Sequence, residues 1–163
     1  TPNDVASAVA GQEVVISCLG RRAASDRDVL QNAAFATVRA MESSATRRLI
    51  AISQGLLFPS NSPLVALLRL ALKRHVTDSR AMERTIRESS LQWTIVRPPR
   101  LLDGQKRKGY RTQTGARPSG ASSMLRTDLA DYLLDEAERN QHLCSIVGIT
   151  SNWWTNGHRP FEA

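Results

Sequence analysis

Cysteine is scarce in this chain. Among 163 residues only Cys18 and Cys144 occur, without a Cys-x-x-Cys pair or a Cys/His spacing that would hold a metal. A disulfide framework and a metal site are therefore not expected. Each cysteine lies inside an apolar segment, so both are predicted to be reduced, buried thiols.

Long apolar runs are absent as well. No segment approaches the roughly 20 apolar residues that cross a bilayer, and the first residues, Thr1 to Asp4, resemble no signal peptide. The sequence thus predicts a cytoplasmic protein without a membrane partner. With 41% hydrophobic residues the chain can build one sizeable core, and a single domain is expected over residues 1–150.

Aromatic side chains make up only 5% of the residues, although the formal net charge is +7. Such a charge suits nucleic acid, anionic lipid or a phosphorylated small molecule, and it does not choose among them. The densest basic stretch, residues 97–117, contains Lys106-Arg107-Lys108 but only one aromatic residue, Tyr110. Because a platform of rings for base stacking is missing, a small molecule rather than nucleic acid is the expected partner.

Apolar patterning predicts strands that alternate with helices. Buried strands are expected at residues 13–20, 49–53, 91–96 and 143–149, because these runs are continuously apolar and β-rich. Helical spacing predicts helices between them, at residues 3–11, 25–44, 63–90 and 127–137. The third helix begins with a stripe of leucines at positions 64, 67, 68 and 72.

Several polar residues are expected to cap these helices. Ser25 with Asp28 forms a capping box, Asp78 can cap a continuation of the third helix, and Thr127 can cap the last. Residues 103–123 are predicted to form a long excursion with one short strand around Tyr110.

This alternation predicts an α/β fold, a doubly wound parallel sheet with helices on both faces. In such sheets ligands bind outside the carboxyl ends of the strands, here residues 17–22, 53–55 and 97–100. The tail, residues 151–163, contains Trp153 and Trp154 and no periodicity, and its role stays open.

Four phrases in order resemble the atypical short-chain dehydrogenase/reductases, which include NmrA-like proteins and the flavin (biliverdin) reductase type. They are VAGQEVVISCLG (residues 9–20), RRLIAIS (47–53), ERTIRESSLQWTIVRPP (83–99) and RTDLA (126–130). The resemblance implies a Rossmann-like NAD(P)-binding domain with NADP or NAD as cofactor.

The resemblance also assigns the cofactor-binding side of the site. The loop after the first matching strand is expected beside the adenine-ribose and pyrophosphate, which implies Ser17, Leu19 and Gly20. A purely structural role for Gly20, at the end of the strand, stays open. The segment Arg97-Pro98-Pro99 resembles the turn whose backbone lies beside the nicotinamide carboxamide.

On the substrate side, Ser53 follows the second matching strand and is the candidate catalytic residue, near the nicotinamide or the substrate carbonyl. Gln54 stands where reductases of this type carry a second hydroxyl, and Arg100 where the flavin type places a residue near the isoalloxazine. Both are candidate substrate-binding residues.

Two family features are missing. The Tyr-x-x-x-Lys pair of the classical enzymes is replaced by His75 and Ser79. His75 can in principle donate a proton, but within Lys73-Arg74-His75 it is expected to be exposed. No glycine-rich phosphate turn of the type G-x-G-x-x-G occurs either, so the fold is expected to lack its first strands. The chain is then either a fragment of a longer protein, which is the favoured expectation, or a natural truncation.

These features lead to two functional hypotheses. The first is an NAD(P)H-dependent oxidoreductase that transfers a hydride to a flavin-, quinone- or carbonyl-type acceptor. The alternative is a non-catalytic NAD(P)-binding redox sensor of the NmrA-like type. In either case, the strand at residues 14–19 becomes an unguarded sheet edge, through which a homodimer could form.

Overall fold

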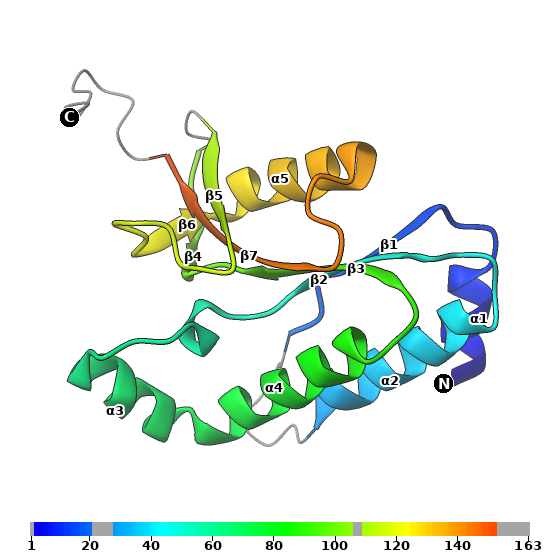
Figure 1. Cartoon of the computed structure of the whole chain (residues 1–163), viewed down its shortest axis with the longest axis horizontal. Coiled ribbons are helices and arrows are strands. Elements are labelled where there is room, and N and C mark those ends of the chain that lie inside the picture. The colour runs from blue at the N-terminus through cyan, green and yellow to red at the C-terminus, as the bar shows by residue number, and fades with distance from the viewer. Residues whose placement is uncertain (1, 21–27, 106–108, 153–163) are drawn as a thin grey trace.

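The computed structural model describes residues 2–20, 28–105 and 109–152 (Figure 1). Its main sheet has the strand order β1-β2-β3-β7-β5. The strands are β1 (Val14–Ser17), β2 (Arg48–Ile52), β3 (Gln92–Arg97), β7 (Ser145–Ser151) and β5 (Tyr110–Thr114). Neighbours from β1 to β7 pair in parallel, and β5 runs antiparallel to β7. The predicted parallel sheet and the strand around Tyr110 are confirmed.

Helices cover both faces of this sheet, as the α/β prediction requires. One face carries α1 (Pro2–Val9), α2 (Val29–Glu42) and α4 (Lys73–Arg87), and the other carries α5 (Arg126–Arg139). The first core contains Leu30, Met41, Leu49, Ile86 and Ile95, and the second contains Ile50, Val96, Leu129, Leu133 and Val147. Alternate residues of β2 and β3 therefore point into opposite cores.

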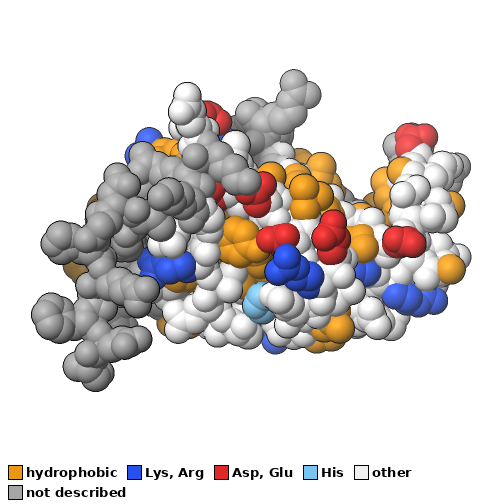
Figure 2. All heavy atoms as spheres, turned by 90° about the horizontal axis from the view of Figure 1, so that it is seen from above, with side chains coloured by type: hydrophobic (Ala, Val, Ile, Leu, Met, Phe, Trp, Pro, Cys, Tyr) orange, Lys and Arg blue, Asp and Glu red, His pale blue; other side chains and the backbone are white. Residues whose placement is uncertain are grey.

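The surface over α5 is marked by charge. Figure 2 looks onto this face, where Asp and Glu side chains gather over the helix. The acidic residues of α5 that are not buried are Asp131, Asp135 and Glu138.

Shorter elements extend the carboxyl edge of the sheet. After β2 come η1 (Gly55–Leu57), a single turn, and α3 (Pro63–Ala71), which begins at a proline suited to the first helical position. After β3, β4 (Arg100–Leu102) pairs in parallel with β6 (Ser123–Leu125) in a second, two-stranded sheet. Figure 1 shows α3 projecting away from the main sheet beyond the start of α4.

The capping predictions for Asp78 and Thr127 are wrong. Asp78 lies inside α4, and its buried carboxylate accepts hydrogen bonds from the backbone N–H groups of Leu30 (3.2 Å) and Gln31 (3.0 Å), at the start of α2. It therefore caps a neighbouring helix. Asp28 makes no side-chain cap, Ser25 lies outside the described residues, and α5 begins before Thr127.

Burial also differs from the prediction. Cys18 and Cys144 are exposed, because the first follows the edge strand β1 and the second lies in the turn before β7. The residues of β1 are half-buried rather than buried, since in the described part of the chain β1 has a strand neighbour on one side only. The leucine stripe of α3 contributes no buried residue.

Candidate functional site

A cavity of about 800 Å³ lies at the carboxyl ends of β2 and β3. Its walls come from η1 and α3 on one side and from β4 and the loop before β6 on the other. The lining residues used below are Gln54, Gly55, Phe58, Leu64, Leu68, Leu72, His75, Arg97, Pro98, Pro99, Arg100 and Arg117. A volume of this size is typical of small-molecule sites.

The loops after β2 and β3 are held together by their backbones. The Ser53 N–H donates to the Val96 carbonyl, and the Gly55 N–H donates to the Pro98 carbonyl, each at 2.7 Å. A Cβ at position 55 would lie 2.9 Å from the Pro98 carbonyl oxygen, closer than real Cβ atoms approach. Glycine is therefore required there, and the two loops form one continuous floor.

Beneath this floor lies a buried ion pair. The Arg97 guanidinium donates two hydrogen bonds to Glu83, from Nε to Oε1 (2.9 Å) and from Nη2 to Oε2 (2.5 Å). The Ser53 hydroxyl donates to Glu83 Oε1 at 2.6 Å. Ser53 does not line the cavity and its hydroxyl is already engaged, so it lies where it can position Arg97 rather than touch a ligand.

Arg97 also contacts Phe58, the aromatic residue that lines the cavity. Its Cζ lies 4.8 Å from the centroid of the Phe58 ring, a cation–π contact. On the other side of η1, the Arg69 guanidinium of α3 donates to the carbonyls of Leu56 (2.9 Å) and Phe58. Two arginines thus hold the segment that carries Phe58.

Polar groups enter the cavity from η1 and α4. The Gln54 side-chain amide donates from Nε2 to Ser79 Oγ (2.7 Å) and to the His75 carbonyl (3.3 Å). His75 is half-buried and lines the cavity, so the expectation of a merely exposed histidine is wrong. It lies there because it occupies the first turn of α4, directly after α3.

The charged side chains that line the cavity are all basic. Arg97, Arg100 and Arg117 contribute three cations, and no Asp or Glu is among the described residues that line the cavity. Glu83 neutralises Arg97, whereas Arg100 and Arg117 are exposed at the cavity. The cavity therefore favours a ligand with negative charge or electron-rich oxygen atoms.

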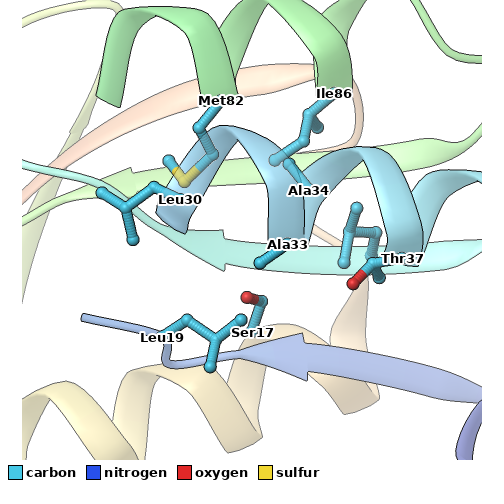
Figure 3. Close-up of a pocket in the computed structure, with 9 residues that line it drawn as sticks. Ser17, Leu19, Leu30, Ala33, Ala34, Thr37, Met82 and Ile86 are labelled. Atoms are coloured by element: carbon cyan, nitrogen blue, oxygen red, sulfur yellow. The ribbon is translucent and has the colours of Figure 1, made fainter. Parts of the chain in front are cut away.

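The residues predicted around β1 lie elsewhere. Ser17 and Leu19 line a separate cavity of about 10 Å³, where they face Ala33 and Thr37 of α2 (Figure 3). This volume holds about one water molecule. Gly20 is exposed, and a Cβ there would meet no atom within 4 Å.

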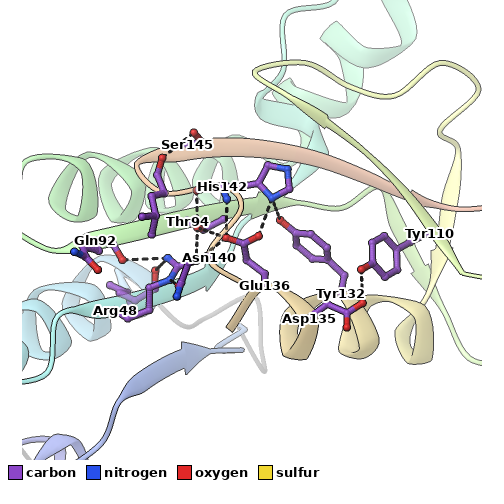
Figure 4. Close-up of polar contacts among 12 residues, drawn as sticks. Arg48, Gln92, Thr94, Tyr110, Tyr132, Asp135, Glu136, Asn140, His142 and Ser145 are labelled. Atoms are coloured by element: carbon purple, nitrogen blue, oxygen red, sulfur yellow. Dashed lines mark hydrogen bonds and ion pairs between the residues drawn. The ribbon is translucent and has the colours of Figure 1, made fainter. Parts of the chain in front are cut away.

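A second polar cluster occupies the opposite, amino-terminal edge of the sheet (Figure 4). The buried Arg48 guanidinium donates from Nη2 to Glu136 Oε1 (2.7 Å) and to Thr94 Oγ1 (2.8 Å). His142 Nδ1 lies 2.7 Å from Glu136 Oε2. Burial lowers the pKa of Arg48, although the Glu136 carboxylate opposes that shift. The cluster ties α5 to β2 and β3.

Two tyrosines extend this cluster along α5. Their rings meet edge to face, with 5.2 Å between the centroids of Tyr110 and Tyr132. Burial, together with a hydrogen bond to Asp135, raises the pKa of Tyr110 to about 12. Burial likewise raises the pKa of Tyr132. Both side chains are therefore neutral phenols that strengthen packing around α5.

Comparison with known proteins identifies the family of this chain. Residues 1–140 match the model of the family described as NAD(P)H-binding. The chain belongs to this family. The family confirms the predicted NAD(P)-binding domain and the predicted cofactor, NAD or NADP. No curated protein sequence matches the chain.

Solved structures share the fold of this family member. A Rossmann-fold NAD(P)-binding family protein from Shigella flexneri has 21% identity and a TM-score of 0.72 over 100% of this chain and 72% of that chain. A wide-type short-chain dehydrogenase/reductase from Veillonella parvula, in complex with NADP, has 22% identity and a TM-score of 0.71. The match covers 94% of this chain and 69% of that chain. A provisionally assigned NADH-flavin reductase from Streptococcus pneumoniae has 19% identity and a TM-score of 0.76. The match covers 90% of this chain and 75% of that chain.

The residues at the carboxyl edge fit the nicotinamide end of such a cofactor. At the floor a Cβ on Gly55 would collide with the Pro98 carbonyl oxygen, and the cavity over it has a volume of about 800 Å³. Open space beside Gly20 suits the adenosine side.

The structure therefore brings together part of the predicted site. Gln54, Arg97, Pro98, Pro99 and Arg100 surround one cavity, and Ser53 lies just below it. Sequence reasoning missed Phe58, His75, Arg117 and the leucines of α3 as lining residues. Phe58 and the leucines of α3 flank the loop at residues 59–63, which is a signal that could have found them, whereas no sequence signal links Arg117 to this loop. Within the described residues, no cluster of His, Cys, Asp and Glu could hold a metal ion.

Proposed function

We propose that the chain forms the acceptor-binding part of an NAD(P)H-dependent oxidoreductase that reduces a flavin-, quinone- or carbonyl-type compound. The observation that carries this proposal is the cavity of about 800 Å³ over the floor formed by Gly55 and Pro98. Its walls are apolar and its charged lining is cationic, which suits a flat conjugated molecule with electron-rich oxygen atoms.

The cofactor-side residues keep the roles that the resemblance implies. Bound NAD(P)H supplies a hydride, and the chain orients the reactants and excludes water. Ser17, Leu19 and Gly20 would contact the adenosine side, and Pro98 and Pro99 the nicotinamide side. Ser53 would act as a positioning residue, because its hydroxyl holds Glu83 and thereby Arg97.

The acceptor-side residues supply contacts and a proton. Arg100 would pair with an electron-rich oxygen of the acceptor, and Gln54 would offer its side-chain oxygen, since its amide nitrogen already donates to α4. His75 would donate a proton to the acceptor atom that gains negative charge during hydride transfer, and it would recover that proton from water. Gln54 is thus a binding residue and His75 the proton donor.

Consumption of NADH or NADPH tests the proposal, measured on the complete protein as its gene encodes it. A flavin, a naphthoquinone and an aldehyde would be compared as acceptors. We expect His75→Asn to lower kcat and to alter its pH profile, and Arg100→Gln to raise KM for the acceptor. Arg74→Gln, an exposed neighbour that does not line the cavity, is the matched control.

The result also decides against the alternative. Cofactor binding without turnover of any acceptor would refute the reductase and support the redox sensor. Turnover that is unchanged in His75→Asn and Arg100→Gln would place the reaction outside this cavity.

A further inference from the structure

Helix α3 exposes an unusual amount of apolar surface. Four leucines of α3 and Leu72, the residue directly after it, form what we call the leucine face, and each is between 40% and 69% exposed: Leu64, Leu67, Leu68, Leu70 and Leu72. None of the residues of α3 is buried, and the helix projects beyond the sheet (Figure 1). Leu64, Leu68 and Leu72 also line the cavity at the carboxyl edge, whereas Leu67 and Leu70, which are 61% and 69% exposed, lie outside its lining. Exposed apolar surface of this kind marks a surface that binds a partner.

Charge identifies the kind of partner. From Pro63 to Arg87 the exposed ionisable side chains are basic: Lys73, Arg74, Arg80, Arg84 and Arg87. The two acidic residues in this stretch, Asp78 and Glu83, are each only 4% exposed. Leucines are thus followed immediately by an array of cations.

A second copy of the chain does not fit this surface. Two leucine faces in contact would offer Lys73 and Arg74 of either copy no exposed acidic side chain from this stretch to pair with. An anionic lipid surface matches both properties, because leucines enter the region between headgroups and acyl chains while lysine and arginine meet lipid phosphates.

We propose that the leucine face of α3 docks on an anionic membrane surface as an interfacial helix. Such docking needs no spanning segment, and no described helix is long and apolar enough to cross a membrane. It revises the expectation of a protein without a membrane partner. The acidic side chains over α5 lie on the other face of the sheet from α4, so they do not oppose this orientation (Figures 1 and 2). The docking does not depend on the proposed reductase function.

Vesicle flotation tests the docking with the full chain. Vesicles of phosphatidylcholine with phosphatidylglycerol should carry the protein, whereas pure phosphatidylcholine should carry much less. Raising the salt from about 0.1 M to about 0.5 M should weaken binding, because the cations are exposed and screened. Leu67→Ser/Leu70→Ser should lower the partition coefficient about tenfold or more, since two apolar side chains leave the lipid.

Two further variants make the test specific. Lys73→Gln/Arg74→Gln should also lower partitioning about tenfold or more. Leu134→Ser, which alters a leucine that is 60% exposed on α5, should leave it unchanged. Circular dichroism confirms that each variant is folded.

Absence of flotation on anionic vesicles, or equal flotation of Leu67→Ser/Leu70→Ser, would overturn the proposal. So would light scattering that shows a wild-type oligomer which this variant dissolves, because a second copy would then occupy the leucine face.

Discussion

Glu83→Gln tests the ion pair beneath the cavity. The substitution keeps the size of the side chain but removes the charge that faces the Arg97 guanidinium. The side chains of Arg97 and Glu83 are only 12% and 5% exposed, so the arginine charge would be left largely buried without its counter-ion. Breaking a buried pair in this way costs about 3–5 kcal/mol. In a domain of this size the midpoint of thermal unfolding should fall by about 6–20 °C.

The double variant Glu83→Gln/Arg97→Met removes both charges and supplies a decisive comparison. We expect it to be more stable than Glu83→Gln alone, because no isolated charge is then buried. Urea denaturation followed by circular dichroism measures each free energy of unfolding. Glu88→Gln, the same chemical change at an exposed position after α4, should cost less than about 0.5 kcal/mol. The reasoning would be refuted if the loss of stability in the double variant equalled the sum of the losses in Glu83→Gln and in Arg97→Met alone.

Further predictions concern pH, the cofactor and the sheet edge. Because the pKa of Tyr110 rises from 10.0 to about 12 on folding, its contribution to stability is complete below pH 10 and is lost as pH rises toward 12. Alkaline unfolding of Tyr110→Phe should show a smaller loss over that window, and an equal loss would contradict the assignment. Gly20→Trp should fold, since a Cβ there meets open space, yet should abolish NAD(P)H binding in fluorescence titration; unchanged affinity would remove Gly20 from the site. The edge strand β1 carries Val14, Val15 and Ile16 with no lysine or proline to guard it, so the chain alone should dimerise or aggregate in size-exclusion chromatography with light scattering. A cooperatively melting monomer would argue against that edge contact.

Periodicity alone predicted most of the sheet. Continuous apolar runs are typical of strands buried between two layers of helices, and β2 and β3 match such runs within a residue or two. Strand ends then located the edge at which Gln54, Arg97 and Arg100 meet. The exposure of Cys18 could not be predicted in this way, because it depends on whether β1 has a strand neighbour on each side.

The other wrong predictions concern residues whose contacts are with residues far away in the sequence. A leucine stripe at helical spacing is the same for a core helix and for the exposed helix α3, since periodicity fixes a face and not what lies against it. Asp78 has the chemistry of a cap, but the backbone N–H of Leu30 that it caps lies 48 residues earlier. Ser53 similarly finds its acceptor 30 residues away, at Glu83.

The cluster around Arg48 has a consequence for how the molecule opens. Detaching α5 would break the ion pair of Arg48 with Glu136 and its hydrogen bond to Asn140, so α5, β2 and β3 should open together as one cooperative unit. Helix α3 buries no residue and can open at little cost. Native-state hydrogen exchange should therefore give one shared, high protection for the central strands and α5, with fast exchange in α3. The cavity would then lie between the slowest-exchanging strands of the protein and its fastest-exchanging helix.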